Sequence, residues 1–192
     1  MLEGRRTIQR FQKVLDENPA LARYIQKLEK EAVKDSLTGL FNSNQFKPFL
    51  KREFEMAKRY NRAVSLILVD IDNFKSYNDK YGHVEGDKVI RNIGRVMKRK
   101  IRGTDYVFRY GYGEEFAIIL PSTDLKGARQ VAERIRRTIE NQKFREKVTV
   151  SMGVATYLPP REMDYLGLLK LADAQLYRAK QEGKNKVCAF SG

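Results

Sequence analysis

The sequence predicts an α/β fold in which strands and helices alternate around an antiparallel hairpin. Three observations support this. Residues 64–72 form a continuous apolar run, which is typical of a buried central strand. Two short strand patterns, 105–110 and 115–120, flank a glycine-bearing turn and indicate a hairpin. Apolar residues at helical spacing alternate with the strands through the rest of the chain.

The first 34 residues predict a separate N-terminal helical segment that precedes a domain over residues 35–192. Apolar residues form two short seams along it: Ile8, Phe11 and Leu15 before Pro19, and Leu21, Ile25, Leu28 and Ala32 after it. Such seams suit a partner helix, as in a coiled coil. They equally suit a helix packed on its own domain, and the pattern leaves both interpretations open.

The elements expected after this segment follow from apolar spacing and turn residues. They are a helix over 43–60, the strand 64–72, a helix over about 85–101, the hairpin 105–110 and 115–120, a helix over about 124–142, a strand 148–157, a helix 162–182 and a short last strand 187–190. Strands and helices therefore alternate around a hairpin in the middle of the domain.

Composition excludes several classes of protein. A chain of 192 residues with 42% hydrophobic residues suits one domain with a short appendage. No apolar run approaches the ~20 residues that span a bilayer, and the first residues lack the apolar stretch of a signal peptide. We therefore expect a cytoplasmic protein without membrane insertion. One cysteine and one histidine exclude an intrachain disulfide, a cysteine metal cluster and a two-histidine site.

The net charge of +14 favours an anionic partner, although a solvated basic surface would also account for it. The basic residues are spread along the chain, and no zinc finger, RNP-type aromatic strand or helix-turn-helix pattern is present. These features favour phosphate-bearing small molecules and predict no nucleic-acid partner.

Two acidic pairs each lie where a strand meets a loop. Asp70 and Asp72 end the most apolar strand, and residues i and i+2 of a strand share a face. Glu114 and Glu115 follow Gly111-Tyr112-Gly113 at the hairpin tip. Either pair alone could be a strand end or turn in solvent, but carboxylates gathered in one place need a compensating cation. Oxygen ligands suit Mg²⁺, or Mn²⁺ in its place.

A metal of this kind would assist phosphoryl or nucleotidyl transfer. No serine–histidine or cysteine–histidine nucleophile is apparent, so the attacking group would come from the substrate. Asn78 and Asp87 offer an amide and a carboxylate that together can read guanine, although they could equally be capping residues of a helix and loop. Lys75, Lys180 and Lys184 are candidate phosphate contacts.

Several motifs occur in a fixed order. They are Asp35-Ser36-Leu37-Thr38-Gly39-Leu40, Asp70-Ile71-Asp72-Asn73-Phe74-Lys75, Asn78-Asp79, Gly82-His83-Val84-Glu85-Gly86-Asp87, Gly113-Glu114-Glu115-Phe116, Ser151-Met152-Gly153-Val154-Ala155, Ala172-Asp173-Ala174-Gln175-Leu176-Tyr177-Arg178-Ala179-Lys180 and Gly183-Lys184-Asn185. In these motifs, residues 35–190 resemble the GGDEF family of diguanylate cyclases.

The resemblance implies an α+β fold like the catalytic domain of class III nucleotide cyclases and the palm of polymerases, in which a central mixed sheet with an antiparallel hairpin is wrapped by helices. It also implies that two GTP molecules are condensed into cyclic di-GMP and two pyrophosphates. Carried over by position, Asp70, Glu114 and the Ile71 carbonyl would bind Mg²⁺, and Glu115 would assist that metal site. Glu114 would also help to activate the ribose 3′-hydroxyl, and Asn78 and Asp87 would recognise guanine. The residues that would bind the rest of the substrate are Phe74, Lys75, Lys180 and Lys184.

The resemblance further implies a two-fold homodimer, because each domain binds one GTP and the product is symmetric. The helix of residues 1–34 would then join two catalytic domains below an upstream sensor domain missing from this chain. Arg102-Gly103-Thr104-Asp105 matches the RxxD inhibitory site of the family, which binds cyclic di-GMP, and Arg134 resembles its secondary arginine.

The chain departs from the family pattern at the hairpin tip. The family has two adjacent glycines before the acidic pair, whereas here Tyr112 lies between Gly111 and Gly113. Tyr112 is either an insertion between the glycines or a replacement of the first glycine with a slip upstream, and the normal spacing from Asp105 to Arg109 favours the insertion. One more residue changes the turn and could shift the strand register. Two functions follow as alternatives: an active cyclase, which we favour, or a catalytically impaired domain that binds GTP or cyclic di-GMP as a sensor.

Overall fold

The computed structural model describes residue 14 and residues 16–111 and 113–190. In chain order the elements are α2 (Pro19–Val33), α3 (Ser43–Arg59), β1 (Val64–Ile71), α4 (Phe74–Tyr81), α5 (His83–Lys100), β2 (Tyr106–Arg109), β3 (Glu115–Pro121), α6 (Leu125–Glu140), β4 (Val150–Tyr157), α7 (Tyr165–Gln181) and β5 (Val187–Ala189).

The sheet has the strand order β2-β3-β1-β4-β5 among the described residues. Only the β4–β5 pair is parallel, so the sheet is mixed, as predicted. β1 lies in the centre, pairs with β3 and β4, and is buried at every residue. Its continuous apolar sequence follows from this position, because helices cover both of its faces.

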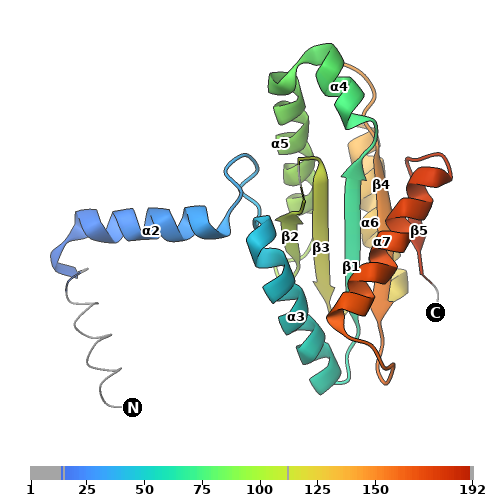
Figure 1. The fold of residues 1–192 in the computed structure, drawn as a ribbon, viewed down its shortest axis with the longest axis horizontal. Helices are drawn as coiled ribbons and strands as arrows, with labels where there is room; N and C mark the ends of the chain where they lie inside the picture. The colour runs from blue at the N-terminus through green and yellow to red at the C-terminus, as the bar shows by residue number, and fades with distance from the viewer. Residues whose placement is uncertain (1–13, 15, 112, 191–192) are drawn as a thin grey trace.

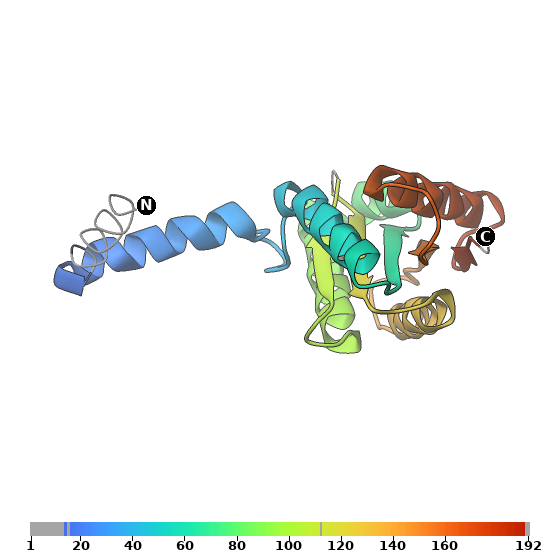
Figure 2. The same ribbon diagram turned by 90° about the horizontal axis from the view of Figure 1, so that it is seen from below.

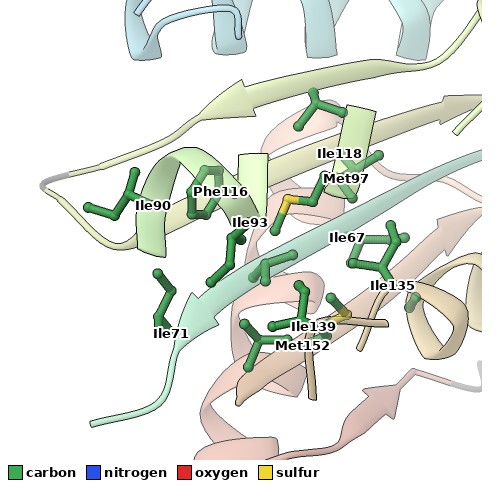
Figure 3. Packing of buried hydrophobic residues seen from close by; sticks show 14 of the residues in the cluster. Ile67, Ile71, Ile90, Ile93, Met97, Phe116, Ile118, Ile135, Ile139 and Met152 are labelled. Atoms are coloured by element: carbon green, nitrogen blue, oxygen red, sulfur yellow. The ribbon is translucent and has the colours of Figure 1, made fainter. Parts of the chain in front are cut away.

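Helices cover the sheet in two layers (Figures 1 and 2). α3 and α7 pack on one face, against Leu66 and Leu68 of β1. α4, α5 and α6 pack on the other, against the intervening residues of the same strand. Figure 3 shows this second cluster, where Ile67 and Ile71 of β1 meet side chains from α5, α6 and β4. Alternation along β1 thus divides the core into two clusters.

The prediction missed one helix. A single helix was expected over 85–101, but α4 precedes α5 and the two meet at Gly82, whose φ of 82° is outside the helical range. α4 has eight residues and buries Phe74 and Tyr77, too short a pattern to separate from a loop by spacing alone. The other expected elements are present, with boundaries that move by at most three residues.

α2 extends away from the sheet and its helices in both views (Figures 1 and 2). Pro19 is its first residue, and the Asn18 side chain caps it by accepting a hydrogen bond from the Leu21 amide. Of the predicted seams, Ile8, Phe11 and Leu15 lie outside the described residues. Nowhere in the described chain is a helix both long and apolar enough to cross a bilayer.

Candidate active site

The carboxylate of Asp70 is buried at the end of β1. Its side chain lies on the α7 face, and its Oδ2 is 2.7 Å from the ammonium of Lys180. Burial raises the pKa of Asp70 above its ordinary value, and the nearby Lys180 ammonium opposes that rise. A buried carboxylate that needs a positive neighbour is a favourable place for a second cation.

Asp72 follows β1 and organises the loops around it. Its carboxylate accepts hydrogen bonds from the hydroxyls of Thr149 (2.7 Å) and Ser151 (2.6 Å) and from the Asn185 amide (3.0 Å). The last contact holds the turn that carries Lys184, whose ammonium donates to Asn73. Asp72 therefore fixes the position of a candidate phosphate contact, a role that the sequence did not reveal.

The hairpin tip lies beside the end of β1. Glu115 is the β3 partner of Asp70, and the Ile71 amide donates to the Glu114 carbonyl at 3.3 Å. The two acidic segments predicted to share a site are thus adjacent at their backbones. Both glutamates are half-buried.

The strand register is regular up to the tip, because the Tyr110 amide donates to the Glu115 carbonyl at 2.9 Å. The loop between them consists of residues 111–114. Gly111 and Gly113 both have positive φ, and a Cβ on Gly111 would lie 1.8 Å from the Glu115 carboxylate. A residue with a side chain could not replace Gly111 without displacing Glu115.

Arg109 joins this loop to the segment that follows α2. Its guanidinium donates to the Gly113 carbonyl at 3.1 and 3.2 Å and to the Asp35 carboxylate at 3.1 and 3.3 Å. Asp35 also accepts from the amide and hydroxyl of Thr38, which fixes its own turn. Sequence reasoning did not select Arg109. Its place two residues before Gly111 was the available signal.

The donor set fits a small, hard cation with few protein ligands. Within the part of the chain that the structure describes, no three histidine, cysteine, aspartate or glutamate side chains converge on a common ion. Asp70, Glu114 and a backbone carbonyl at Ile71 would therefore have to be completed by phosphate oxygens and water. Mg²⁺ prefers that arrangement, and the Lys180 ammonium already shows that a cation is favourable beside Asp70.

The two residues predicted to read guanine come from adjacent helices. Asn78 lies on α4 and Asp87 on α5, one residue after Gly86. A Cβ on Gly86 would lie 1.9 Å from the Asn78 Oδ1, so the two helices meet closely there. That Oδ1 is buried against Gly86 and has no hydrogen-bond partner among the described residues.

The remaining substrate candidates differ in their surroundings. Phe74 is buried in the core beneath the site, so its role there is to support α4. Lys180 contacts Asp70 directly, and Lys184 is exposed on the turn held by Asp72. Lys75 is exposed on the first turn of α4.

The predicted inhibitory site lies near the start of β2. The Asp105 carboxylate is buried and accepts from the Arg102 amide at 2.8 Å, so it also closes the turn. Its other oxygen has no partner among the described residues. Arg134, on α6, donates to the Lys100 carbonyl at 2.7 Å, and the side chains of Arg102 and Arg134 are both exposed.

The chain is similar in sequence to a known family and to several of its members. The family model "Diguanylate cyclase, GGDEF domain" matches residues 32–186. An uncharacterised Bacillus subtilis protein, YhcK, is 41% identical over 80% of this chain and 44% of its own length. The probable diguanylate cyclase DgcC of Escherichia coli is 34% identical over 87% of this chain and 46% of its own length. The chain thus spans less than half the length of these relatives.

Solved structures give the same result. The GGDEF domain of DgcB from Caulobacter crescentus, in complex with cyclic di-GMP, has a TM-score of 0.77 and 34% identity over 82% of this chain and 95% of that one. The coiled coil and GGDEF domain of the same protein match with a TM-score of 0.83 and 29% identity, over 96% of this chain and 99% of that one. With its mixed sheet, its acidic hairpin beside Asp70 and these matches, the chain belongs to the GGDEF domain family of diguanylate cyclases.

Proposed function

We propose that the protein is a diguanylate cyclase that condenses two GTP molecules into cyclic di-GMP. In each of two steps, a ribose 3′-oxygen forms a bond to the α-phosphorus of the other GTP, the bond to the β-phosphate breaks, and pyrophosphate leaves. The observation that carries the proposal is the buried Asp70 carboxylate, paired with Lys180 and adjacent to the Glu114 backbone.

Asp70, Glu114 and the Ile71 carbonyl would hold Mg²⁺ or Mn²⁺. When bound, the ion would neutralise phosphate charge and lower the pKa of the 3′-hydroxyl. Glu114 helps to activate that hydroxyl, and Glu115 assists the metal site. Lys180, which lies 2.7 Å from Asp70, is placed to contact phosphate oxygens as well, together with Lys184 and Lys75.

Guanine recognition is assigned to Asn78 and Asp87. The Asp87 carboxylate would accept from the guanine N1–H and exocyclic amine, and the Asn78 amide would complement the other edge of the base. Adenine lacks the N1 hydrogen and the exocyclic amine at that position. The pair therefore favours GTP over ATP.

Each domain holds one GTP, so the working unit is a two-fold homodimer in which two sites face each other. We assign residues 1–34 to a signalling segment and residues 35–192 to the catalytic domain. The projection of α2 away from the sheet supports a role in joining two copies (Figure 2). Because longer relatives exist, an upstream sensor domain is part of this proposal.

Product feedback is assigned to Arg102, Asp105 and Arg134. The exposed guanidinium groups of Arg102 and Arg134 offer donors for phosphate, and the carboxylate of Asp105, which closes the turn after Arg102, is the proposed acceptor for guanine N–H groups. The relative from Caulobacter crescentus whose structure contains cyclic di-GMP supports this ligand.

A second candidate function is a catalytically impaired domain that binds GTP or cyclic di-GMP. Its support is the hairpin loop, where the two glycines that the family places side by side are separated by Tyr112. In that case the acidic pair would bind nucleotide without turnover.

Incubation with GTP and Mg²⁺, followed by chromatography of the nucleotides, decides between the two. We expect cyclic di-GMP and two equivalents of pyrophosphate, with no product from ATP. Absence of product at high protein concentration, together with retained GTP binding, would leave the impaired domain as the function.

A further inference from the structure

A basic cavity lies at the edge of the sheet opposite to Lys184 and is bordered by α5, which packs on the face opposite to the helix of Lys180. It has a volume of about 320 Å³ and is enclosed by the turn after α2, by α5 and by β2. β2 forms one edge of the sheet, whereas Lys184 precedes β5 at the other edge. The cavity is therefore separate from the proposed phosphate contacts.

Positive side chains from two segments converge on this cavity. α5 contributes Arg91, Arg95, Lys98 and Arg99, which repeat at helical spacing along one side of the helix. Lys34, directly after α2, contributes a fifth from the other wall. No acidic residue lines the cavity among the residues that the structure describes.

One of these positive charges is held at the cavity by an aromatic ring. The ammonium of Lys34 lies 3.3 Å from the centroid of the Phe41 ring, which keeps it at the cavity. Burial and the nearby Lys98 both lower the pKa of Lys34. In the described chain, no carboxylate lies within ion-pair distance of Arg95, Lys98 or Arg99, whereas Arg91 is 3.8 Å from Asp87. A multivalent anion would relieve this repulsion.

We propose that this cavity binds a small phosphate-bearing anion, with a diphosphate group as the chemistry it fits best. Guanidinium groups match phosphate oxygens in pairs, and several cations around one cavity favour a multiply charged ligand. The volume is at the low end of known ligand sites, which suits a diphosphate or one nucleotide rather than a cyclic dinucleotide. Leu40, Phe41 and Val107 give the cavity an apolar floor.

The ligand would connect two parts of the protein. Lys34 follows α2 directly, and α5 carries Asp87 one turn before Arg91. An anion held between Lys34 and α5 would therefore join the end of α2 to the helix that holds one of the proposed guanine contacts.

Titration of the full chain with inorganic pyrophosphate in metal-free buffer, followed by amide NMR, tests the proposal. The amides of Thr38, Gly39 and Phe41 report on the cavity, and those near Lys184 report separately on the proposed active site. We expect saturable shifts of the cavity amides. The double substitution Arg95→Ala/Lys98→Ala should weaken that binding at least about tenfold while the shifts near Lys184 persist.

A matched control removes the same charge elsewhere. Lys51→Ala/Lys58→Ala changes two exposed lysines of α3 and should leave the affinity of the cavity within about twofold of the unsubstituted protein. A parallel titration with GTP shows whether a nucleotide or the free anion is the better ligand. The proposal fails if the cavity amides do not shift, if the Arg95/Lys98 variant binds normally, or if the control loses as much affinity. Because binding is the readout, failure here leaves the proposed cyclase activity standing.

Discussion

Asp70 lies on a strand that is paired on both sides along its length, whereas Glu114 lies in a loop held by a few contacts. β1 pairs with β3 and β4, and Asp70 also contacts Lys180 of α7. The loop of residues 111–114 is held by the Ile71 and Tyr110 amides at its C-terminal end and by Arg109 at Gly113. One half of the proposed metal site is therefore fixed by the sheet, and the other half lies in a loop that a few backbone and side-chain hydrogen bonds hold.

This difference in support separates the chemistry of a metal ligand from its placement. The sheet determines where Asp70 is, so its contribution depends on its chemistry. The loop determines where Glu114 is, so its contribution depends on placement, and a misplacement of 1 Å can cost about 100-fold in rate. Variants that change the charge of Asp70 test the chemistry of the site, and variants that remove the contacts of the loop test the placement of Glu114.

The largest effect is expected at Asp70. Asp70→Asn removes the charge that holds the ion but keeps the size of the side chain, so we expect cyclic di-GMP formation to fall at least about 100-fold. The melting temperature should change little, because the buried carboxylate is already unfavourable, as its raised pKa shows. Asp79→Asn, on the exposed side of α4, is the control and should keep full activity. Equal losses in both variants would contradict the assignment.

A smaller effect is expected at Arg109. Arg109→Ala removes the support of Gly113 together with the Asp35 contact, and we expect kcat to fall about tenfold with little change in KM for GTP. Arg109→Lys should recover part of the loss. The control is Arg178→Ala, which breaks an exposed ion pair with Glu182 on α7. If Arg109→Ala retains full activity, the loop does not need this support.

The pH dependence of metal binding tests the role of Asp70 as a metal ligand. Its raised pKa means that Asp70 takes up a proton at a higher pH than an ordinary aspartate, and a protonated carboxyl does not hold Mg²⁺. Affinity for Mg²⁺ should therefore fall as the pH is lowered. Lys180→Ala removes the charge that opposes the rise in pKa, so the fall should begin at a higher pH. Calorimetric titration across pH measures both, and identical profiles would contradict the account.

The smallest effect is expected from shortening the loop. Deletion of Tyr112 restores two adjacent glycines while the Tyr110–Glu115 pairing continues to set the register. We expect cyclase activity to change less than about tenfold, well below the cost of a 1 Å misplacement. A much larger gain on deletion would show that the longer loop impairs the enzyme and would favour the binding-module alternative.

Sequence patterns predicted the fold well where apolar spacing was long and regular. The run of residues 64–72 indicated a central strand because burial on both faces leaves no alternation to read, and β1 is buried throughout. α4 was missed because its eight residues give only two buried positions. A glycine at positive φ, rather than a change of periodicity, separates it from α5.

The residues of the site could be predicted from the sequence only in part. The acidic pairs were recognisable because carboxylates at strand ends need an explanation. Arg109 and Asp72 were not, since their partners are distant in sequence: Asp35 for the arginine, and Thr149, Ser151 and Asn185 for the aspartate. Contacts of this kind depend on the packed sheet and have no local pattern.

The most direct test of the shared metal site is a titration with Mn²⁺ in the presence of a non-hydrolysable GTP analogue, followed by electron paramagnetic resonance. We predict that Asp70→Asn and Glu114→Gln each weaken Mn²⁺ binding at least about tenfold, because each residue supplies a ligand to the same ion. Unchanged Mn²⁺ affinity in Glu114→Gln would contradict the account, because the hairpin would then supply no ligand.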